Sequence, residues 1–198
     1  RRWFWRRGSI RFMVTKNDTT EIVTQPKLQE SVEPSFRRWL KHFFYMPASK
    51  RYFSKQDQVV IAQAVQQSED GHVGEIQVVI EGHIPSHQAY YQNTRLRAQQ
   101  LFAELGVWDT EFNSGVLLYL NLCEQTVEIV VDRGINLKTS TKVWQQICDQ
   151  IVAELKNKQY RSAVVNGVVE IGKVLNLFYN DKKPDMMNEL SNQPIILN

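Results

Sequence analysis

Side chains that carry oxygen ligands gather around two apolar runs, and their chemistry is that of a divalent cation site. The five residues are Glu75, Asp109, Glu111, Asn113 and Asp132. Carboxylate and amide oxygens are hard ligands that select calcium or magnesium over zinc. A divalent ion also offsets the mutual repulsion of clustered carboxylates. The same acids could instead cap helices and solvate loops, so the hypothesis depends on whether they meet in space.

Three predicted strands decide that question. Gly115–Leu122 and Thr126–Val131 are apolar or β-branched runs, and the three residues between them predict an antiparallel hairpin. Glu75–Glu81 is an earlier strand, separated from Gly115 by a helical segment. A strand-helix-strand connection within one sheet is normally parallel. The start of the first strand, the start of the second and the end of the third are therefore expected at one end of the sheet.

Three sequence motifs in a fixed order, GEIQVV, LGVWDTEFNSGVLLYL and VEIVVDRGI, resemble those of the TPM domain family over roughly residues 36–180. The resemblance implies an α/β fold, a three-layer α/β/α sandwich with a small mixed β-sheet flanked by helices. It also implies oxygen-rich binding of Ca²⁺ or Mg²⁺. Some members of the family have weak acid-phosphatase activity, and many act as accessory or repair factors.

Two functions remain open at this stage. In the first, the chain is a metal-binding accessory module that assists assembly or repair of membrane proteins, with a membrane protein as its partner. In the second, it is a weak metal-dependent acid phosphatase, and catalytic residues are then unknown because no nucleophile-base pair is evident. Phosphate would be held by Arg133 and by the backbone at Ser114 and Gly115, and the resemblance adds Arg97. We favour the binding module, since carboxylates at a sheet end do not make an enzyme.

The charge of the chain is unevenly distributed. Residues 1–55 carry 13 Lys/Arg and 4 Asp/Glu, a net charge of +9, whereas residues 56–198 carry 11 and 17, a net charge of −6. A basic arm on an acidic domain favours an anionic membrane surface as partner. The sequence does not favour nucleic acid as a partner, because no motif that reads bases accompanies the basic residues.

An amphipathic basic helix is predicted over residues 34–46. Phe36 and Trp39 share one face, with Arg37, Arg38 and Lys41 around the other. Two interpretations stand: the aromatic face packs on the domain, or it lies in the plane of a membrane surface with these five residues facing the lipid.

The remaining chain divides into a basic, loose leader over 1–33, a TPM-like domain over 50–180 and a loose tail over 181–198, of which residues 195–197 could instead dock on another part of the protein. Residues 1–12 are either a remnant of the gene boundary, with Met13 as the natural start, or a membrane-seeking arm. No run approaches the ~20 apolar residues that span a bilayer, and no export signal is evident. The expected location is the cytoplasm, with a peripheral place at the inner membrane face. The oligomeric state is not predicted.

Four helices are expected within the domain. Ser54 and Asp57 form a capping box for a helix to about Ser68, and a second helix runs from Ser86 to Leu105. Thr139-Ser140-Thr141 caps a third, and the last spans about 162–179. Cys123 and Cys148 are expected to be buried or idle thiols.

Overall fold

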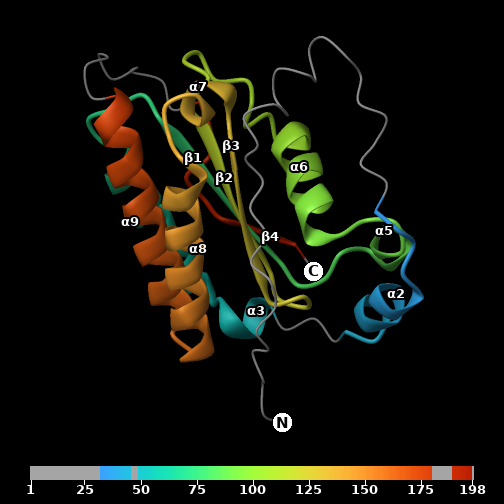
Figure 1. Ribbon diagram of the computed structural model, residues 1–198. Coiled ribbons are helices and arrows are strands. Elements are labelled where there is room, and N and C mark those ends of the chain that lie inside the picture. The colour runs from blue at the N-terminus through green and yellow to red at the C-terminus, as the bar shows by residue number, and fades with distance from the viewer. Residues whose placement is uncertain (1–31, 46–48, 180–188, 198) are drawn as a thin grey trace.

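A mixed four-stranded sheet forms the centre of the computed structural model, which describes residues 32–45, 49–179 and 189–197 (Figure 1). The strand order is β3-β2-β1-β4. The strands are β1 (Glu75–Glu81), β2 (Gly115–Asn121), β3 (Thr126–Val131) and β4 (Ile195–Leu197). Strand β1 is parallel to β2 and β4, and β3 is antiparallel to β2. The predicted parallel crossover and hairpin are confirmed.

Helices cover both faces of the sheet, which gives the three-layer α/β/α arrangement (Figure 1). One layer contains α4 (Lys55–Glu69), α8 (Thr141–Lys156) and α9 (Tyr160–Tyr179), and the other contains α6 (Thr94–Glu104). The short helices are α2 (Phe36–Phe43), α3 (Ser49–Tyr52), α5 (Ser86–Ala89) and α7 (Arg133–Asn136).

Alternation along the strands supplies a core on each side of the sheet. Val78 and Ile80 join the larger cluster with α4, α8 and α9, whereas Val79 between them joins the smaller cluster with α6. Leu118 and Tyr119 divide in the same way. Successive side chains of a strand point to opposite faces, so a strand that is apolar on both faces must be covered twice.

The start of α4 follows the sequence closely. The Ser54 hydroxyl accepts a hydrogen bond from the Asp57 N–H at 3.2 Å, and the Asp57 carboxylate accepts one from the Ser54 N–H at 3.0 Å. This reciprocal pair is the predicted capping box. The helix ends at Glu69, and Gly71 follows at φ +89°, a conformation that glycine adopts without a Cβ penalty.

The prediction of a single helix from Ser86 to Leu105 is wrong in one respect, because this segment forms two helices. Helix α5 ends at Ala89, and α6 begins at Thr94 with Asn93 as its N-cap. The Asn93 side-chain oxygen accepts from the Leu96 N–H at 2.9 Å. A residue that satisfies an otherwise unpaired helix N–H favours a new start over continuation.

The prediction of a loose tail over 181–198 is wrong for residues 195–197, which form β4 on the free edge of β1. Ile195 and Leu197 pack toward the α6 side and Ile196 toward the opposite side. Residues 180–188 and 198 lie outside the described residues. The same holds for residues 1–31, on which the predictions for the leader fall, and for residue 46, the predicted end of the amphipathic helix. No helix in the described ranges combines the length and hydropathy needed to cross a bilayer.

Candidate functional site

The sheet topology brings one set of predicted residues to a common end, which we name the Asp132 end. Its members are Glu75, Asn113, Ser114, Gly115 and Asp132. Glu75 is the register partner of Gly115, and the Glu75 N–H donates to the Ser114 carbonyl at 3.3 Å. The Asp132 N–H donates to the Gly115 carbonyl at 2.9 Å. The end lies beside α7 at the top of Figure 1.

Asp132 is a buried carboxylate that is only half satisfied. It caps α7, and Oδ1 accepts a hydrogen bond from the Arg133 N–H at 2.5 Å. The side chain is 7% exposed, and Oδ2 has no hydrogen-bond partner among the described residues. Burial raises the pKa of this carboxyl above its usual range, and the Arg133 N–H opposes that rise. A buried anion with one free oxygen favours a cation beside it.

Backbone carbonyl oxygens pack closely against this end. A Cβ on Gly134 would lie 2.4 Å from the Asn113 oxygen and 3.1 Å from the Phe112 oxygen. Asn113 itself adopts φ 51°, a left-handed conformation that asparagine tolerates better than most residues. Glycine at 134 therefore admits carbonyl oxygens that any larger residue would displace. Carbonyl oxygens are regular ligands of calcium, so the surroundings of Asp132 fit a hard cation.

The other predicted carboxylates are turned elsewhere. Glu75 accepts from the backbone N–H groups of Leu190 and Glu189, at 3.4 and 3.5 Å. The Glu111 N–H donates to both carboxylate oxygens of Glu189, at 3.1 and 3.2 Å. Among the described residues, no three carboxylates at the Asp132 end bring ligand atoms within 4.8 Å of one another. The common end is confirmed, but convergence of the acids is not seen.

Asp109 and Asn113 lie in the loop before β2, and both are exposed. Neither carries a buried, unsatisfied group of the kind found at Asp132.

Sequence reasoning missed a further acid near this end, Glu69 at the close of α4. Its Oε1 accepts from the Ile76 N–H at 2.7 Å. Burial, together with the nearby Glu75 charge, raises its pKa to about 8, although the Ile76 hydrogen bond opposes the shift. Burial thus disfavours the charged form of Glu69, so it adds less negative charge near the Asp132 end than an ordinary glutamate would. An acid at the end of an amphipathic helix, six residues before the start of the expected strand at Glu75, was the available signal.

Two of the predicted phosphate ligands need correction. Arg97 lies at the other end of β1, where its Nε and Nη2 donate to Oε1 of Glu81 at 3.0 and 2.8 Å. Six residue steps of strand, roughly 20 Å, separate Glu81 from Glu75. Ser114 is fully buried, its N–H donates to Thr110 Oγ1, and its hydroxyl donates to the Val73 carbonyl. Neither residue is available to phosphate at the Asp132 end.

Of the other two, Gly115 is covered by a neighbouring carbonyl. A Cβ at this position would lie 1.9 Å from the Val107 oxygen, which shows how closely the chain crosses it. Arg133 is exposed beside Asp132. Arg133 is therefore the one predicted phosphate ligand whose side chain is both exposed and placed at this end.

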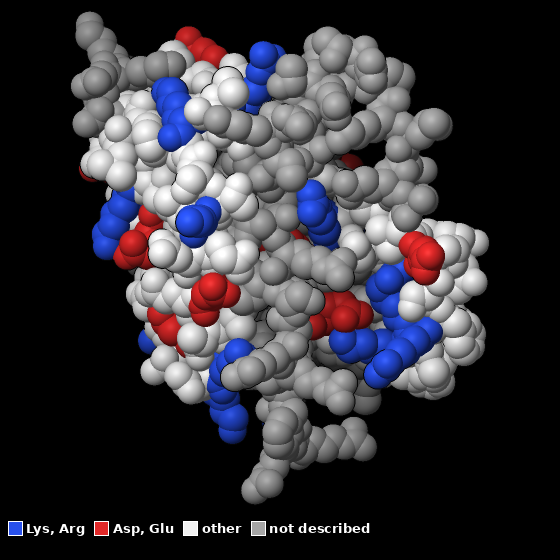
Figure 2. All heavy atoms as spheres, viewed as in Figure 1, with Lys and Arg blue, Asp and Glu red and all other residues white. Residues whose placement is uncertain are grey.

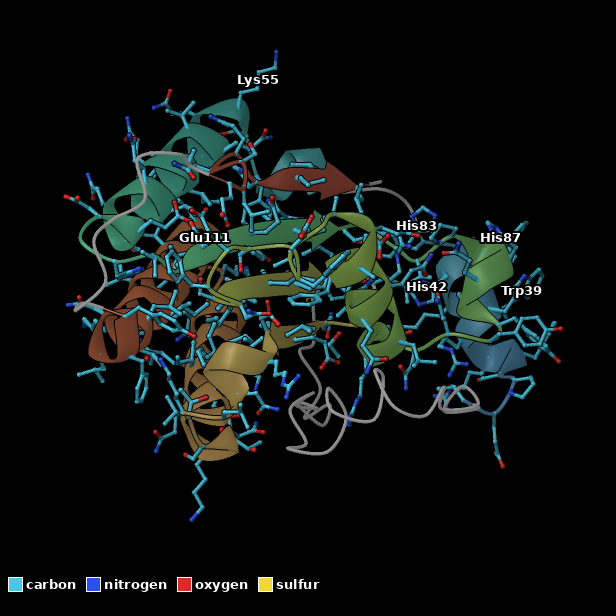
Figure 3. All side chains as sticks on the ribbon, turned by 90° about the horizontal axis from the view of Figure 1, so that it is seen from above. Trp39, His42, Lys55, His83, His87 and Glu111 are labelled. Atoms are coloured by element: carbon cyan, nitrogen blue, oxygen red, sulfur yellow. The ribbon has the colours of Figure 1, made fainter. Side chains whose placement is uncertain are left out.

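The opposite end of the sheet holds a second group of potential ligand atoms. Among the described residues, His42, Cys123 and Glu124 alone bring three such atoms within 4.8 Å of one another. Figure 3 shows His42 at the far end of the molecule from Glu111. The His42 Nδ1 accepts from the Ile84 N–H at 3.1 Å, so the neutral ring carries its proton on Nε2, facing Glu124 at 3.0 Å.

That arrangement fits a structural contact better than a metal. A histidine ligand normally binds metal with one nitrogen and donates from the other, whereas here Nδ1 already accepts. Burial raises the pKa of the Cys123 thiol to about 12, so it stays protonated. The second Glu124 oxygen lies 2.7 Å from Lys41 Nζ. Both cysteines are free and buried, as the sequence predicted.

A polar cavity of about 660 Å³ lies next to this group, between α2, the start of α6 and the β2–β3 hairpin. Its polar walls are largely paired already. Ser35 accepts from the Arg38 N–H, Asn93 caps α6, and the Thr94 hydroxyl donates to Glu128 at 2.8 Å. Thr126 Oγ1 also lines the cavity and has no hydrogen-bond partner among the described residues, but a single hydroxyl does not define a ligand.

The membrane-facing residues predicted on α2 separate into two groups. Phe36 is 63% exposed, Arg37 is exposed and Trp39 is half-buried. Arg38 and Lys41 contact the rest of the domain through hydrogen bonds and an ion pair. The helix therefore attaches to the domain by basic side chains.

The layered sheet, the parallel crossover and the close-packed loop ending in Asp132 define an α/β domain of the TPM class. The sequence model of the TPM domain matches residues 48–174, and the chain belongs to the TPM domain family. Its structure is similar to the NMR structure of BA42 protein from the psychrophilic bacterium Bizionia argentinensis, with a TM-score of 0.64 and 26% sequence identity. The match covers 73% of this chain and 94% of that one. No curated protein sequence matches significantly.

Proposed function

We propose that this protein is a divalent-cation-binding TPM module that takes Ca²⁺ or Mg²⁺ at the Asp132 end. The observation that carries the proposal is the buried Oδ2 of Asp132, which has no partner among the described residues. Asp132 would supply the charged ligand, with backbone oxygen near Asn113 and the side chains of Asn113 and Asp109 beside it. An ion there would provide the partner that the carboxylate lacks.

Glu75 and Glu111 have a secondary role in this proposal. Contacts with residues 189 and 190 now occupy the Glu75 carboxylate and the Glu111 backbone N–H. Glu75 could join the ion only by giving up the Leu190 and Glu189 N–H groups. We therefore expect Asp132 to dominate the affinity and Glu75 to modulate it.

The physiological role that we propose is that of an accessory module in assembly or repair of membrane proteins. Membership in the TPM family supports it. The alternative, a weak metal-dependent phosphatase, draws support from Arg133, which is exposed beside Asp132 and could pair with phosphate oxygens. Arg97 and Ser114, which would have helped it, are engaged elsewhere.

Calorimetric titration of the full chain with CaCl₂ and with MgCl₂ tests the proposal. Asp132→Asn should weaken binding at least severalfold, because it removes a ligand and the charge that attracts the ion. Asp149→Asn is the matched control, since Asp149 is an exposed aspartate on α8 whose Oδ1 accepts from the Gln145 amide of the same helix. Absence of binding up to millimolar ion, or equal binding by Asp132→Asn and wild type, would refute the site.

The same preparations separate the two functions. Hydrolysis of a generic phosphate ester that is lost with EDTA, in Asp132→Asn and in Arg133→Ala would favour the phosphatase. Ion binding without hydrolysis would favour the accessory module. Arg133→Ala should not weaken ion binding, because arginine is not a cation ligand and its loss removes a positive charge beside the site.

A further inference from the structure

Helix α2 exposes its most apolar residues instead of burying them. We name these the aromatic face: Phe36, Trp39, Leu40, Phe43 and Phe44. Phe36 is 63% exposed, Phe43 56% and Phe44 70%. Exposed aromatic residues are common singly, but a contiguous group marks an interaction surface.

The rings of the aromatic face pack against one another. Phe36 stacks on Trp39 with centroids 5.1 Å apart, and Trp39 stacks on Phe43 at the same distance. Phe43 meets Phe44 edge to face, again at 5.1 Å. The result is a continuous aromatic ridge along the helix. Its exposure shows that this ridge is not the surface by which α2 is fixed to the domain.

The opposite side of α2 is fixed by Arg38. Its Nε donates to the Ala89 carbonyl at 2.6 Å, and its Nη2 donates to the Tyr90 carbonyl at 3.0 Å. The Ser35 N–H, at the N-cap of the helix, also donates to the Tyr90 carbonyl at 3.0 Å. Three hydrogen bonds thus join the start of α2 to the end of α5.

His42 and Lys41 fix the other end of the helix. His42 is completely buried, with Nδ1 accepting from the Ile84 N–H and Nε2 3.0 Å from Glu124. Lys41 Nζ lies 2.7 Å from the second Glu124 oxygen. These contacts reach the loop after β1 and the β2–β3 turn, so α2 is held by two separate parts of the chain.

Helix geometry makes these two sides opposite. At about 100° per residue, Arg38 lies roughly 200° from Phe36, and His42 lies roughly 200° from Leu40. The contacts that attach the helix therefore also direct the aromatic face outward. Rotating the helix to bury the rings would expose His42 and break the Arg38 hydrogen bonds. This outward orientation was one of two possibilities left open by the sequence.

We propose that the aromatic face of α2 is a docking surface for an anionic lipid bilayer, with the helix lying in the plane of the headgroups. Aromatic rings beside Lys and Arg suit that layer, where rings enter the acyl boundary and cations meet lipid phosphates. Arg37 is exposed at the edge of the aromatic face. Figure 2 shows Lys and Arg side chains gathered over α2, with uncharged surface on one side and acidic side chains of the domain on the other.

Length and charge favour a bilayer surface over other occupants. The helix has eight residues, well short of the ~20 needed to span, so only an in-plane position is open to it. Helix α2 carries Arg37, Arg38 and Lys41 and no acidic residue. A second copy of the same face would bring these positive charges together, whereas anionic lipid complements them. The proposal does not depend on cation binding at the Asp132 end.

Cosedimentation of the full chain with phosphatidylcholine vesicles containing phosphatidylglycerol is the test. The double variant Phe36→Ser/Phe43→Ser should lower the partition coefficient at least tenfold, a change of ~1.4 kcal/mol. Leu177→Ser is the matched control, because Leu177 is 75% exposed on α9, on the other side of the sheet from α2 (Figure 1). The control should pellet like wild type. The melting temperature of the double variant should stay near that of wild type, since both rings are exposed.

Charge is tested separately. Arg37→Glu should reduce binding severalfold on the anionic vesicles and hardly at all on pure phosphatidylcholine, and added salt should shrink the difference. Lys142→Glu on α8 is the control for net charge. Equal loss in Arg37→Glu and Lys142→Glu would mean that overall charge, not α2, directs binding, and would overturn the proposal.

Two other outcomes would also overturn it. Equal pelleting of wild type and the double aromatic variant would place membrane binding elsewhere in the chain. A wild-type dimer that becomes monomeric in the double variant, with no vesicle binding by either, would make the aromatic face a contact between copies. Sedimentation equilibrium without vesicles measures the second outcome directly.

Discussion

Each end of the sheet buries a carboxylate, and the two are treated in opposite ways. At the carboxyl end of β1, Glu81 is 1% exposed and fully engaged. Arg97 donates to its Oε1 at 3.0 and 2.8 Å, and the Tyr119 hydroxyl donates to its Oε2 at 2.5 Å. At the other end, Asp132 is nearly as buried, but its Oδ2 has no partner among the described residues.

The difference separates structural from ligand-binding acids. A buried carboxylate that is ion-paired and hydrogen-bonded on both oxygens needs nothing further and stabilises one arrangement of the chain. A buried carboxylate with one free oxygen costs stability until something supplies the missing partner. Glu81 therefore has a structural role, whereas Asp132 is the carboxylate whose charge a bound cation would compensate. Removing a partner of Glu81 should therefore lower the free energy of unfolding. Removing the charge of Asp132, in the absence of a cation, should raise it.

The largest effect is expected from Arg97→Ala, which converts Glu81 into an unpaired acid. Breaking a buried ion pair from one side typically costs ~3–5 kcal/mol. Urea unfolding should show that loss in the free energy of unfolding. Glu104→Ala is the control, because Glu104 is 52% exposed and lies 3.9 Å from Arg97. That change should cost about 1 kcal/mol or less, and an equal effect of the two variants would contradict the assignment.

Tyr119→Phe should follow, since it removes one hydrogen bond to the charged Glu81 and leaves the Asn121 amide without its acceptor at 2.8 Å. The expected loss is about 1.5–3 kcal/mol. Combined with Arg97→Ala, the two losses should not add, because both act on one carboxylate. A double-mutant cycle in urea measures the coupling, and strict additivity would show that the contacts are independent.

Glu69→Gln should change how stability depends on pH. The folded pKa of about 8 lies above the ordinary 4.5, so the native state keeps a proton that the unfolded state has released. Stability contributed by this group is present below about pH 4.5 and is lost as pH rises to about 8. The glutamine variant should remove that decline and gain on the order of 2 kcal/mol above pH 8, after allowance for partial solvation. Thermal melts of both proteins across this pH range measure the effect. If stability declines with pH equally in wild type and Glu69→Gln, Glu69 is not the source of the decline.

The smallest effect is expected at the Asp132 end itself. Because burial raises the pKa of Asp132, the wild type loses stability as pH rises through the titration of this carboxyl, and Asp132→Asn does not. With EDTA at neutral pH the variant should be more stable by on the order of 1 kcal/mol. Saturating calcium should reverse the order, because the ion stabilises only the native form that binds it. A less stable variant in EDTA would mean that Asp132 is already satisfied.

Local patterns allowed much of the fold to be predicted. The three longer strands, the hairpin, the Ser54 capping box and the parallel crossover all follow from periodicity, turn length and connection rules. The same rules placed Glu75, Gly115 and Asp132 at one end, because direction along a strand is fixed once its neighbour is parallel. These features depend on residues close in sequence or on general topology.

Pairings between distant residues could not be predicted in this way. The partner of Glu81 is Arg97, 16 residues further along the chain on α6, and no pattern near residue 81 indicated which residue would pair with it. The Glu189 and Leu190 contacts with Glu75 depend on where the tail returns, which no pattern near residue 75 records. The direction of the α2 aromatic face was undecided because His42 is held by Ile84 and Glu124, far along the chain.

Strand β4 has a consequence for the order in which the sheet assembles. It pairs with β1 across 116 residues and contributes three residues, whereas β2 and β3 are joined by a tight turn. Closing so long a loop costs more conformational entropy than closing a hairpin, and the few hydrogen bonds of a short strand offset little of that cost. The strand that joins last should also be the first to open. Amide protons of Ile195–Leu197 should therefore exchange with solvent through local opening, well before those of β1 and β2, which wait for global unfolding.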